Sequence, residues 1–88
     1  MVDAGGPYRY RAEVLNELAR HGARPTRRTR PQLVHEFVSD LYRHELRSLR
    51  ARLVRKEFPK KEYAARVIEL RTRYRLISIR TEEWLDDG

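Results

Sequence analysis

Apolar side chains recur at steps of three and four through the middle of the chain, and neither glycine nor proline interrupts residues 32–58. The positions that share one helical face are Val34, Val38, Tyr42, Leu46, Leu49 and Leu53, and the apolar face is widened by Phe37 and Leu41. This spacing predicts one amphipathic helix over about residues 31–57, roughly 39 Å long at 1.5 Å per residue. Pro31 suits its first position, where the missing N–H would have no partner.

A second amphipathic pattern follows at once. Because a residue before proline is driven out of the helical conformation, Phe58-Pro59 ends the first helix, and Pro59 suits the start of the next. Beyond it, apolar residues alternate at steps of four and three, the spacing of a coiled-coil seam, at Tyr63, Val67, Leu70, Tyr74 and Ile77. The pattern predicts a helix over about residues 59–77, which the short link makes an antiparallel neighbour of the first.

A shorter helix is expected near the N-terminus, over about residues 10–21, with Gly22 as the residue that ends it. The sequence therefore predicts an all-α fold, a small three-helix domain over residues 9–79 in which a long antiparallel hairpin dominates. Residues 1–8 are expected to be disordered. Residues 80–88 are predicted to form an acidic tail, in which Thr81 starts a short helix.

Length and composition restrict how such a domain is stabilised. With 88 residues the chain has a thin core, which small domains reinforce with disulfides, metals or association. Without cysteine, disulfides and thiolate zinc sites are excluded, which leaves association with a second copy or another protein. We find no apolar run long enough to span a bilayer and no apolar signal segment, so we expect a cytoplasmic protein without membrane contact.

The charge of the chain is unevenly distributed. Residues 1–81 hold twenty Lys/Arg and nine Asp/Glu, a net charge of +11, because four of the thirteen acids fall in the last seven residues. The bases gather in a loop (Arg24, Arg27, Arg28, Arg30), on the outer face of the long helix (Arg43, Arg47, Arg50) and at the hairpin tip (Lys60, Lys61). Arginine suits phosphate and carboxylate groups, so these nine residues are candidate contacts to an anion or a nucleic acid. Alternatively, Glu57 and Glu62 neutralise the tip, and its lysines are only solvated.

We find no motif for catalysis. His35-Glu36 begins like a zinc-protease motif but lacks the second histidine, and Asp40 with His44 lacks a third ligand. No glycine-rich loop exists to hold a nucleotide, since the four glycines lie at positions 5, 6, 22 and 88. We therefore expect no enzyme activity, cofactor, metal or small-molecule substrate.

Two functional hypotheses follow. The leading one is a non-enzymatic protein-interaction module, an assembly or accessory subunit of a larger complex or a homo-oligomer. The alternative is a nucleic-acid-binding protein that contacts the backbone through its arginines. Trp84 and Leu85 in the acidic tail are candidate partner contacts, although they could instead cover the core as a lid, or belong to an acidic arm that masks the arginines.

Overall fold

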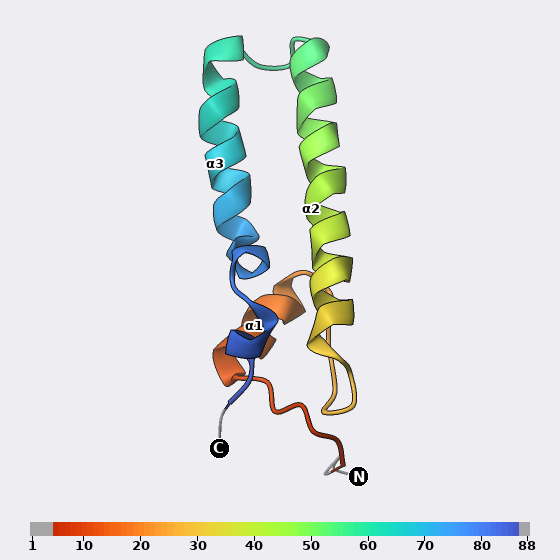
Figure 1. Ribbon diagram of the computed structural model, residues 1–88. Helices are drawn as coiled ribbons and strands as arrows, with labels where there is room; N and C mark the ends of the chain where they lie inside the picture. Colours follow the sequence, from red (N-terminus) through yellow and green to blue (C-terminus); the bar gives the residue numbers. More distant parts are fainter. Residues whose placement is uncertain (1–4, 87–88) are drawn as a thin grey trace.

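The computed structural model describes residues 5–86, and within them the fold is all-α, as predicted. Its helices are α1 (Ala12–Arg20), α2 (Pro31–Val54) and α3 (Tyr63–Arg73), with short 3-10 turns η1 (Lys60–Glu62), η2 (Arg75–Ser78) and η3 (Thr81–Trp84). Figure 1 shows α2 and α3 side by side as an antiparallel hairpin, with α1 crossing its lower end. Residues 5 and 86, where the described part of the chain begins and ends, lie toward that lower end, opposite the hairpin tip.

Helices α1 and α2 end with the same backbone device. After α1, Gly22 takes a positive φ of 82°, and the amides of Gly22 and Ala23 turn back to the Ala19 and Leu18 carbonyls. This is the Schellman closure, and it confirms Gly22 as the residue that ends α1. At the end of α2 the same position is Lys56, with a φ of 60°.

The closure at Lys56 ends α2 three residues before the predicted boundary at residue 57. The Lys56 amide donates to the Leu53 carbonyl (2.9 Å), and the Glu57 amide donates to the Arg52 carbonyl (3.0 Å). These bonds satisfy carbonyls of the last turn that a longer helix would have used. A lysine in the left-handed conformation carries no sequence signal for a helix end, which explains the difference.

Helix α3 is also shorter than the predicted range 59–77. It starts after η1 and ends at Arg73, because Tyr74 leaves the helical conformation (φ −111°, ψ 33°) and η2 follows. In a continuous helix Leu76 would lie about 200° around the axis from Tyr74, facing solvent. The break turns Leu76 inward, where only 1 % of it is exposed, while Tyr74 also stays buried.

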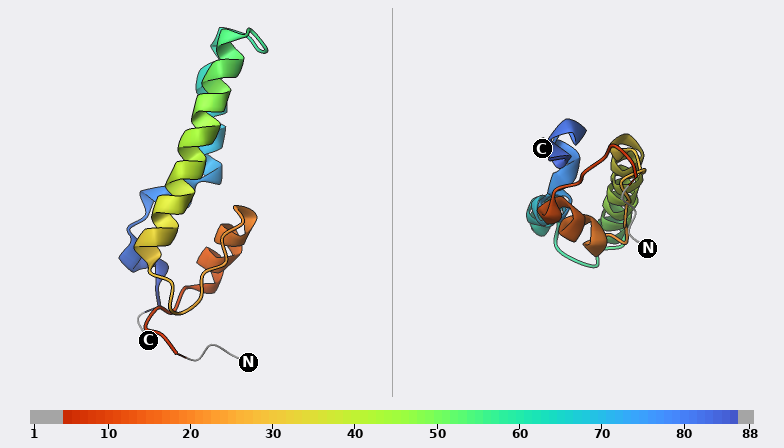
Figure 2. Two further views of the ribbon diagram at one scale, coloured as in Figure 1. Left: turned by 90° about the vertical axis from the view of Figure 1, so that its right-hand side faces the viewer. Right: turned by 90° about the horizontal axis from the view of Figure 1, so that it is seen from below.

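The hydrophobic core lies at the lower end of the hairpin. Its buried members come from the N-terminal segment, α1, the first half of α2, the end of α3 and the tail, namely Tyr10, Val14, Leu18, Val34, Val38, Leu70, Tyr74, Leu76 and Trp84. The tail is fastened to the N-terminal segment: the Arg11 amide donates to the Trp84 carbonyl (2.9 Å), and the Asp86 amide donates to the Arg9 carbonyl (2.8 Å). Figure 2 shows α1 leaning away from the hairpin above this closure.

The N-terminal segment is placed by the loop before α2. Residues 5–8 were expected to be disordered, but the Tyr8 amide donates to the Arg27 carbonyl (3.0 Å). Gly6 passes so close to Arg27 that a Cβ there would lie 2.3 Å from its carbonyl oxygen. Residues 1–4 of the segment expected to be disordered, and residues 87–88 of the acidic tail, lie outside the described residues.

The molecule is elongated. Its radius of gyration is 15.9 Å and its extents are 50 × 21 × 18 Å, whereas a compact chain of this length has a radius of gyration of about 12 Å. We call residues 47–73, the far part of the hairpin, the arm, and the other residues the base. In the arm the buried side chains are Leu49, Phe58 and Leu70, so most of the apolar burial lies in the base.

Candidate interaction surfaces

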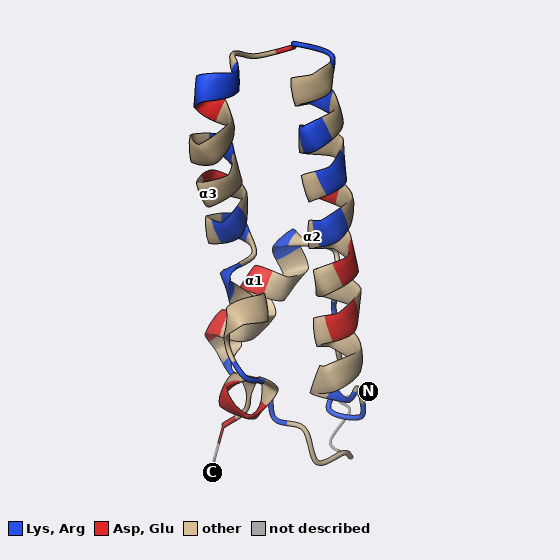
Figure 3. Cartoon of the chain, turned by 45° about the horizontal axis from the view of Figure 1, so that its top comes forward, with Lys and Arg blue, Asp and Glu red and all other residues tan. Residues whose placement is uncertain are grey.

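The arm and the base differ in charge. The arm contains ten Lys/Arg and three Asp/Glu, a net charge of +7, which equals the formal net charge of the whole chain. The base contains ten bases and ten acids and is neutral overall. Figure 3 shows this division, with basic turns along the far part of α2 and the start of α3 and acidic ones on the first half of α2 and the tail. The arm therefore carries the whole excess of positive charge in the molecule.

The predicted basic stripe of α2 starts in the base and runs into the arm. Arg43 forms an ion pair with Asp40 one turn earlier, and both side chains are exposed. Arg47 and Arg50 are exposed as well and form no ion pair with any residue in the described part of the chain. An exposed pair such as Asp40–Arg43 contributes little to stability, about 0–1 kcal/mol.

At the hairpin tip, the acidic residues pair with arginines. Glu57 accepts from Arg55 (2.7 Å) and Arg52 (3.1 Å), and the Arg55 hydrogen bond is the main reason why the pKa of Glu57 lies below its usual range. Glu62 accepts from Arg66 (3.1 Å). Both acids therefore neutralise arginines of the tip, whereas Lys60 and Lys61 are exposed and pair with neither acid. This arrangement is compatible with the alternative in which the two lysines are only solvated, and equally with an anion contact.

Phe58 joins the two helices at the tip. Its ring is 7 % exposed and lies between two guanidinium groups, 4.3 Å from Arg66 and 5.6 Å from Arg52 to the ring centroid. Such cation–π contacts contribute about 0.5–1 kcal/mol each when partly exposed. The turn is thus held by an aromatic ring and charged side chains, and the lysines remain free to face outward.

In the arginine loop, some of the arginine side chains are exposed and others lie against the N-terminal segment. Thr26 and Thr29 order it, because the Thr26 amide donates to Thr29 Oγ1 (3.0 Å) and the Thr29 amide donates to the Thr26 carbonyl (3.0 Å). Arg24 and Arg30 are exposed, whereas Arg27 is half-buried against the N-terminal segment, and the side chain of Arg28 approaches Gly5. The loop lies at the base, so the structure does not bring it together with the stripe or the tip.

Trp84 belongs to the core. Its side chain is 0 % exposed and its ring lies 5.7 Å from that of His35. Leu85 is half-buried and forms a bridge with Tyr10. These positions match the alternative in which Trp84 and Leu85 cover the core as a lid. They place Trp84 where no partner surface could reach it, and the tail lies against the N-terminal segment, away from the tip lysines.

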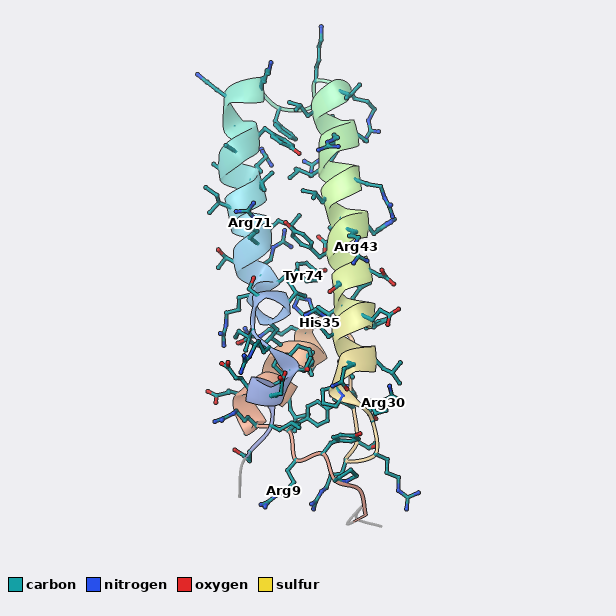
Figure 4. The ribbon with its side chains drawn as sticks, viewed as in Figure 1. Arg9, Arg30, His35, Arg43, Arg71 and Tyr74 are labelled. Carbon is teal, nitrogen blue, oxygen red and sulfur yellow. The ribbon has the colours of Figure 1, made fainter. Side chains whose placement is uncertain are left out.

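A cleft of about 670 Å³ lies where α1 meets the hairpin, and Tyr74 forms part of its wall. The Tyr74 hydroxyl donates to Glu45, and its ring stacks on His21 with centroids 4.3 Å apart. Burial, reinforced by Glu45, raises the pKa of Tyr74 to about 12. Figure 4 shows Tyr74 and His35 between the two helices. Because His21 also donates to the Arg73 carbonyl (2.9 Å), these polar groups hold the elements together.

A second face of α2, which was not predicted from the sequence, exposes large apolar side chains. Phe37, predicted to widen the inward face, is 47 % exposed, because it lies about 100° around the helix from Val38 and turns away from α3. Leu33 and Val54 are exposed on the same outer face, 57 % and 75 % respectively. The spacing of Leu33, Phe37 and Val54 would have predicted this apolar face, but the arginines on the same face suggested a surface exposed to solvent.

Among residues 5–86, no helix is long and apolar enough to cross a membrane. The same residues contain no group of three His, Asp or Glu side chains that could hold a metal ion. No protein-family model matches the chain, and no curated protein or solved structure is similar to it.

Proposed function

We propose that this protein is a non-enzymatic interaction module, an accessory or assembly subunit that inserts its basic arm into an anionic surface of a larger complex. The observation that supports the proposal is the division of charge, with +7 on the arm and zero on the base. A cytoplasmic location is part of the same proposal.

The packing of the arm supports a docking role. Three buried apolar side chains over 27 residues give little stabilisation compared with the core of the base, because burial of one Leu or Phe contributes about 1.5–3 kcal/mol. A helix pair with so little shared core gains stability when a partner covers it. The arm is thus both the charged and the weakly supported part of the molecule, as expected for an element completed by binding.

The tip lysines support the proposal further. Lys60 and Lys61 form η1, just before α3, where positive charge opposes the helix dipole at a cost of a few tenths of a kcal/mol each. Neither forms an ion pair with a described residue. An anionic partner at this position would gain from both lysines and from the helix N-terminus.

A pair of charge-matched variants tests the proposal. Lys60→Glu/Lys61→Glu changes the tip, and Arg24→Glu/Arg30→Glu changes the arginine loop, and each lowers the formal net charge from +7 to +3. Immobilised protein is exposed to host-cell lysate treated with nuclease, and captured proteins are identified by mass spectrometry. We expect the loop variant to keep the partners of the unmodified chain and the tip variant to lose them, although both remain folded by circular dichroism.

If both variants lost the captured partners to the same extent, binding would depend only on the net charge of the chain. That result would contradict docking through the arm. Capture of nothing by the unmodified, folded chain would contradict the proposal altogether. The tip variant should unfold at an equal or slightly higher temperature than the unmodified chain, because glutamate at the start of α3 favours the helix dipole.

A nucleic acid is the second candidate partner, and one observation favours it. Six of the ten arm cations form no ion pair with a described residue, namely Arg47, Arg50, Lys56, Lys60, Lys61 and Arg71. For backbone binding, affinity should fall steeply with salt, by orders of magnitude between about 50 and 200 mM if six phosphates are contacted. Fluorescence anisotropy with a labelled RNA at the two salt concentrations measures this, and affinity independent of salt would remove the candidate.

A further inference from the structure

The outer face of α2 carries a second regular pattern, opposite the face that packs on the core. Its members alternate at steps of four and three, and all are exposed: Leu33, Phe37, Asp40, His44, Arg47, Ala51 and Val54. We call them the outer stripe. At 100° per residue the stripe lies roughly opposite Val38 and Leu49, which are buried. Alternating steps of four and three are the spacing by which two helices pack along a shared seam.

The ends of the outer stripe are apolar and its middle is charged. Leu33 (57 % exposed), Phe37 (47 %) and Val54 (75 %) are three of the large apolar side chains that the described surface exposes. Between the two apolar ends lie Asp40 and Arg47, of opposite charge. Leu33 and Phe37 lie one turn apart and form a contiguous exposed apolar pair, and contiguous apolar side chains mark an interaction surface more than single scattered ones do.

We propose that the outer stripe pairs with the outer stripe of a second copy of this chain, antiparallel, about a two-fold axis beside His44. This inference deepens the proposed function, because it names one of the partners. In this register, two residues of the stripe face each other across the axis when their numbers add up to 87 or 88. Leu33 then faces Val54 of the second copy, and Phe37 faces Ala51 of the second copy. A two-fold interface requires such self-complementarity.

Charge determines the direction of the pairing. In the antiparallel arrangement Asp40 faces Arg47 of the second copy, and this pair occurs twice. A parallel arrangement would place Asp40 beside Asp40 and Arg47 beside Arg47, and would bring two +7 arms together. The antiparallel arrangement instead lays each arm along a neutral base. Opposite charges in register fix helix orientation in this way, and like charges exclude the alternative.

The pairing leaves the proposed docking element accessible. Lys60 and Lys61 lie at the hairpin tip, outside α2, so each copy presents its own tip, one at either end of the dimer. Arg43 lies near the axis with Asp40 as its ion-pair partner, and that carboxylate is shared with Arg47 of the second copy. The dimer would therefore present two docking tips, one at each end.

Sedimentation equilibrium over a wide range of concentration, with charge-swap variants, tests the inference. The unmodified chain is expected to show a monomer–dimer equilibrium. Asp40→Arg and Arg47→Asp should each weaken the dimer affinity by about tenfold or more, because each creates two like-charge pairs across the axis, one on either side of it. The double variant Asp40→Arg/Arg47→Asp restores both cross-axis pairs and should recover most of the association. Ile68→Glu, which alters an exposed apolar residue of α3 outside the stripe, should have no effect.

Crosslinking gives an independent test, because the chain has no cysteine of its own. His44→Cys places one thiol at the axis, and mild oxidation should convert the chain to a covalent dimer, whereas Ile68→Cys, whose thiol lies away from the axis, should form no covalent dimer. A chain that remains a monomer at every concentration, or a charge swap that fails to restore association, would overturn the inference. If such a monomer still captured partners through its tip lysines, the proposed function would stand without the dimer.

Discussion

Single side chains in this molecule often have a role that their type alone does not indicate. Trp84, placed among acidic residues, is a core residue, and Phe58, at an exposed turn, is buried between Arg52 and Arg66. Lys56 ends a helix in a conformation that glycine adopts most easily. In each case a neighbour distant in sequence or a backbone constraint determines the role of the residue.

Lys56 gives a prediction at this scale. Because its φ of 60° is unfavourable for a side chain with a Cβ, Lys56→Gly should raise the free energy of unfolding by about 0.5–1 kcal/mol. Urea denaturation measures the change. Lys56→Ala removes the same charge but keeps the Cβ, so it should stay within about 0.5 kcal/mol of the unmodified chain. Equal stabilisation by both variants would attribute the effect to charge and not to the backbone.

At the scale of the elements, sequence determined the helices better than their ends. The inward face of α2 at Val34, Val38 and Leu49 follows from spacing alone, and so does Gly22 as the end of α1. The end of α3 does not, because it depends on burying Leu76 against elements that come from elsewhere in the chain. Local patterns thus predict elements, and tertiary packing decides where those elements stop.

Two buried tyrosines make the base sensitive to alkaline pH. Burial raises the pKa of both Tyr10 and Tyr74 to about 12, above the value of about 10 expected in the unfolded chain. Between these values the folded chain holds more protons on these two tyrosines than the unfolded chain does, so their contribution to stability should be constant up to about pH 10 and fall from there to about pH 12. Tyr74→Phe should flatten this fall, and urea denaturation at several pH values measures it.

The same variant has a cost at neutral pH, where it removes the hydrogen bond to Glu45. That loss should lower the free energy of unfolding by about 1 kcal/mol. A fall above pH 10 of the same size in the variant and in the unmodified chain would show that Tyr74 does not contribute to it.

At the scale of the whole molecule, the structure separates stability from charge. The base holds most of the core and has no net charge, whereas the arm holds +7 and little core. The basic clusters are visible in the sequence, which also contains no recognised catalytic motif. The sequence did not show that the net charge divides between a neutral base and an arm of +7, nor that the outer stripe of α2 is exposed, because both depend on how the helices pack.

The central claim is that the arm is a weakly supported element which a partner completes. Hydrogen exchange followed by mass spectrometry, on the free chain at low concentration, tests it directly. We expect amides of residues 47–73 to exchange about tenfold or more faster than those of the first half of α2 and of η2, because local opening is easiest where few apolar side chains are buried. Equal protection along the whole hairpin would contradict the claim, since an arm as stable as the base would need no partner to complete it.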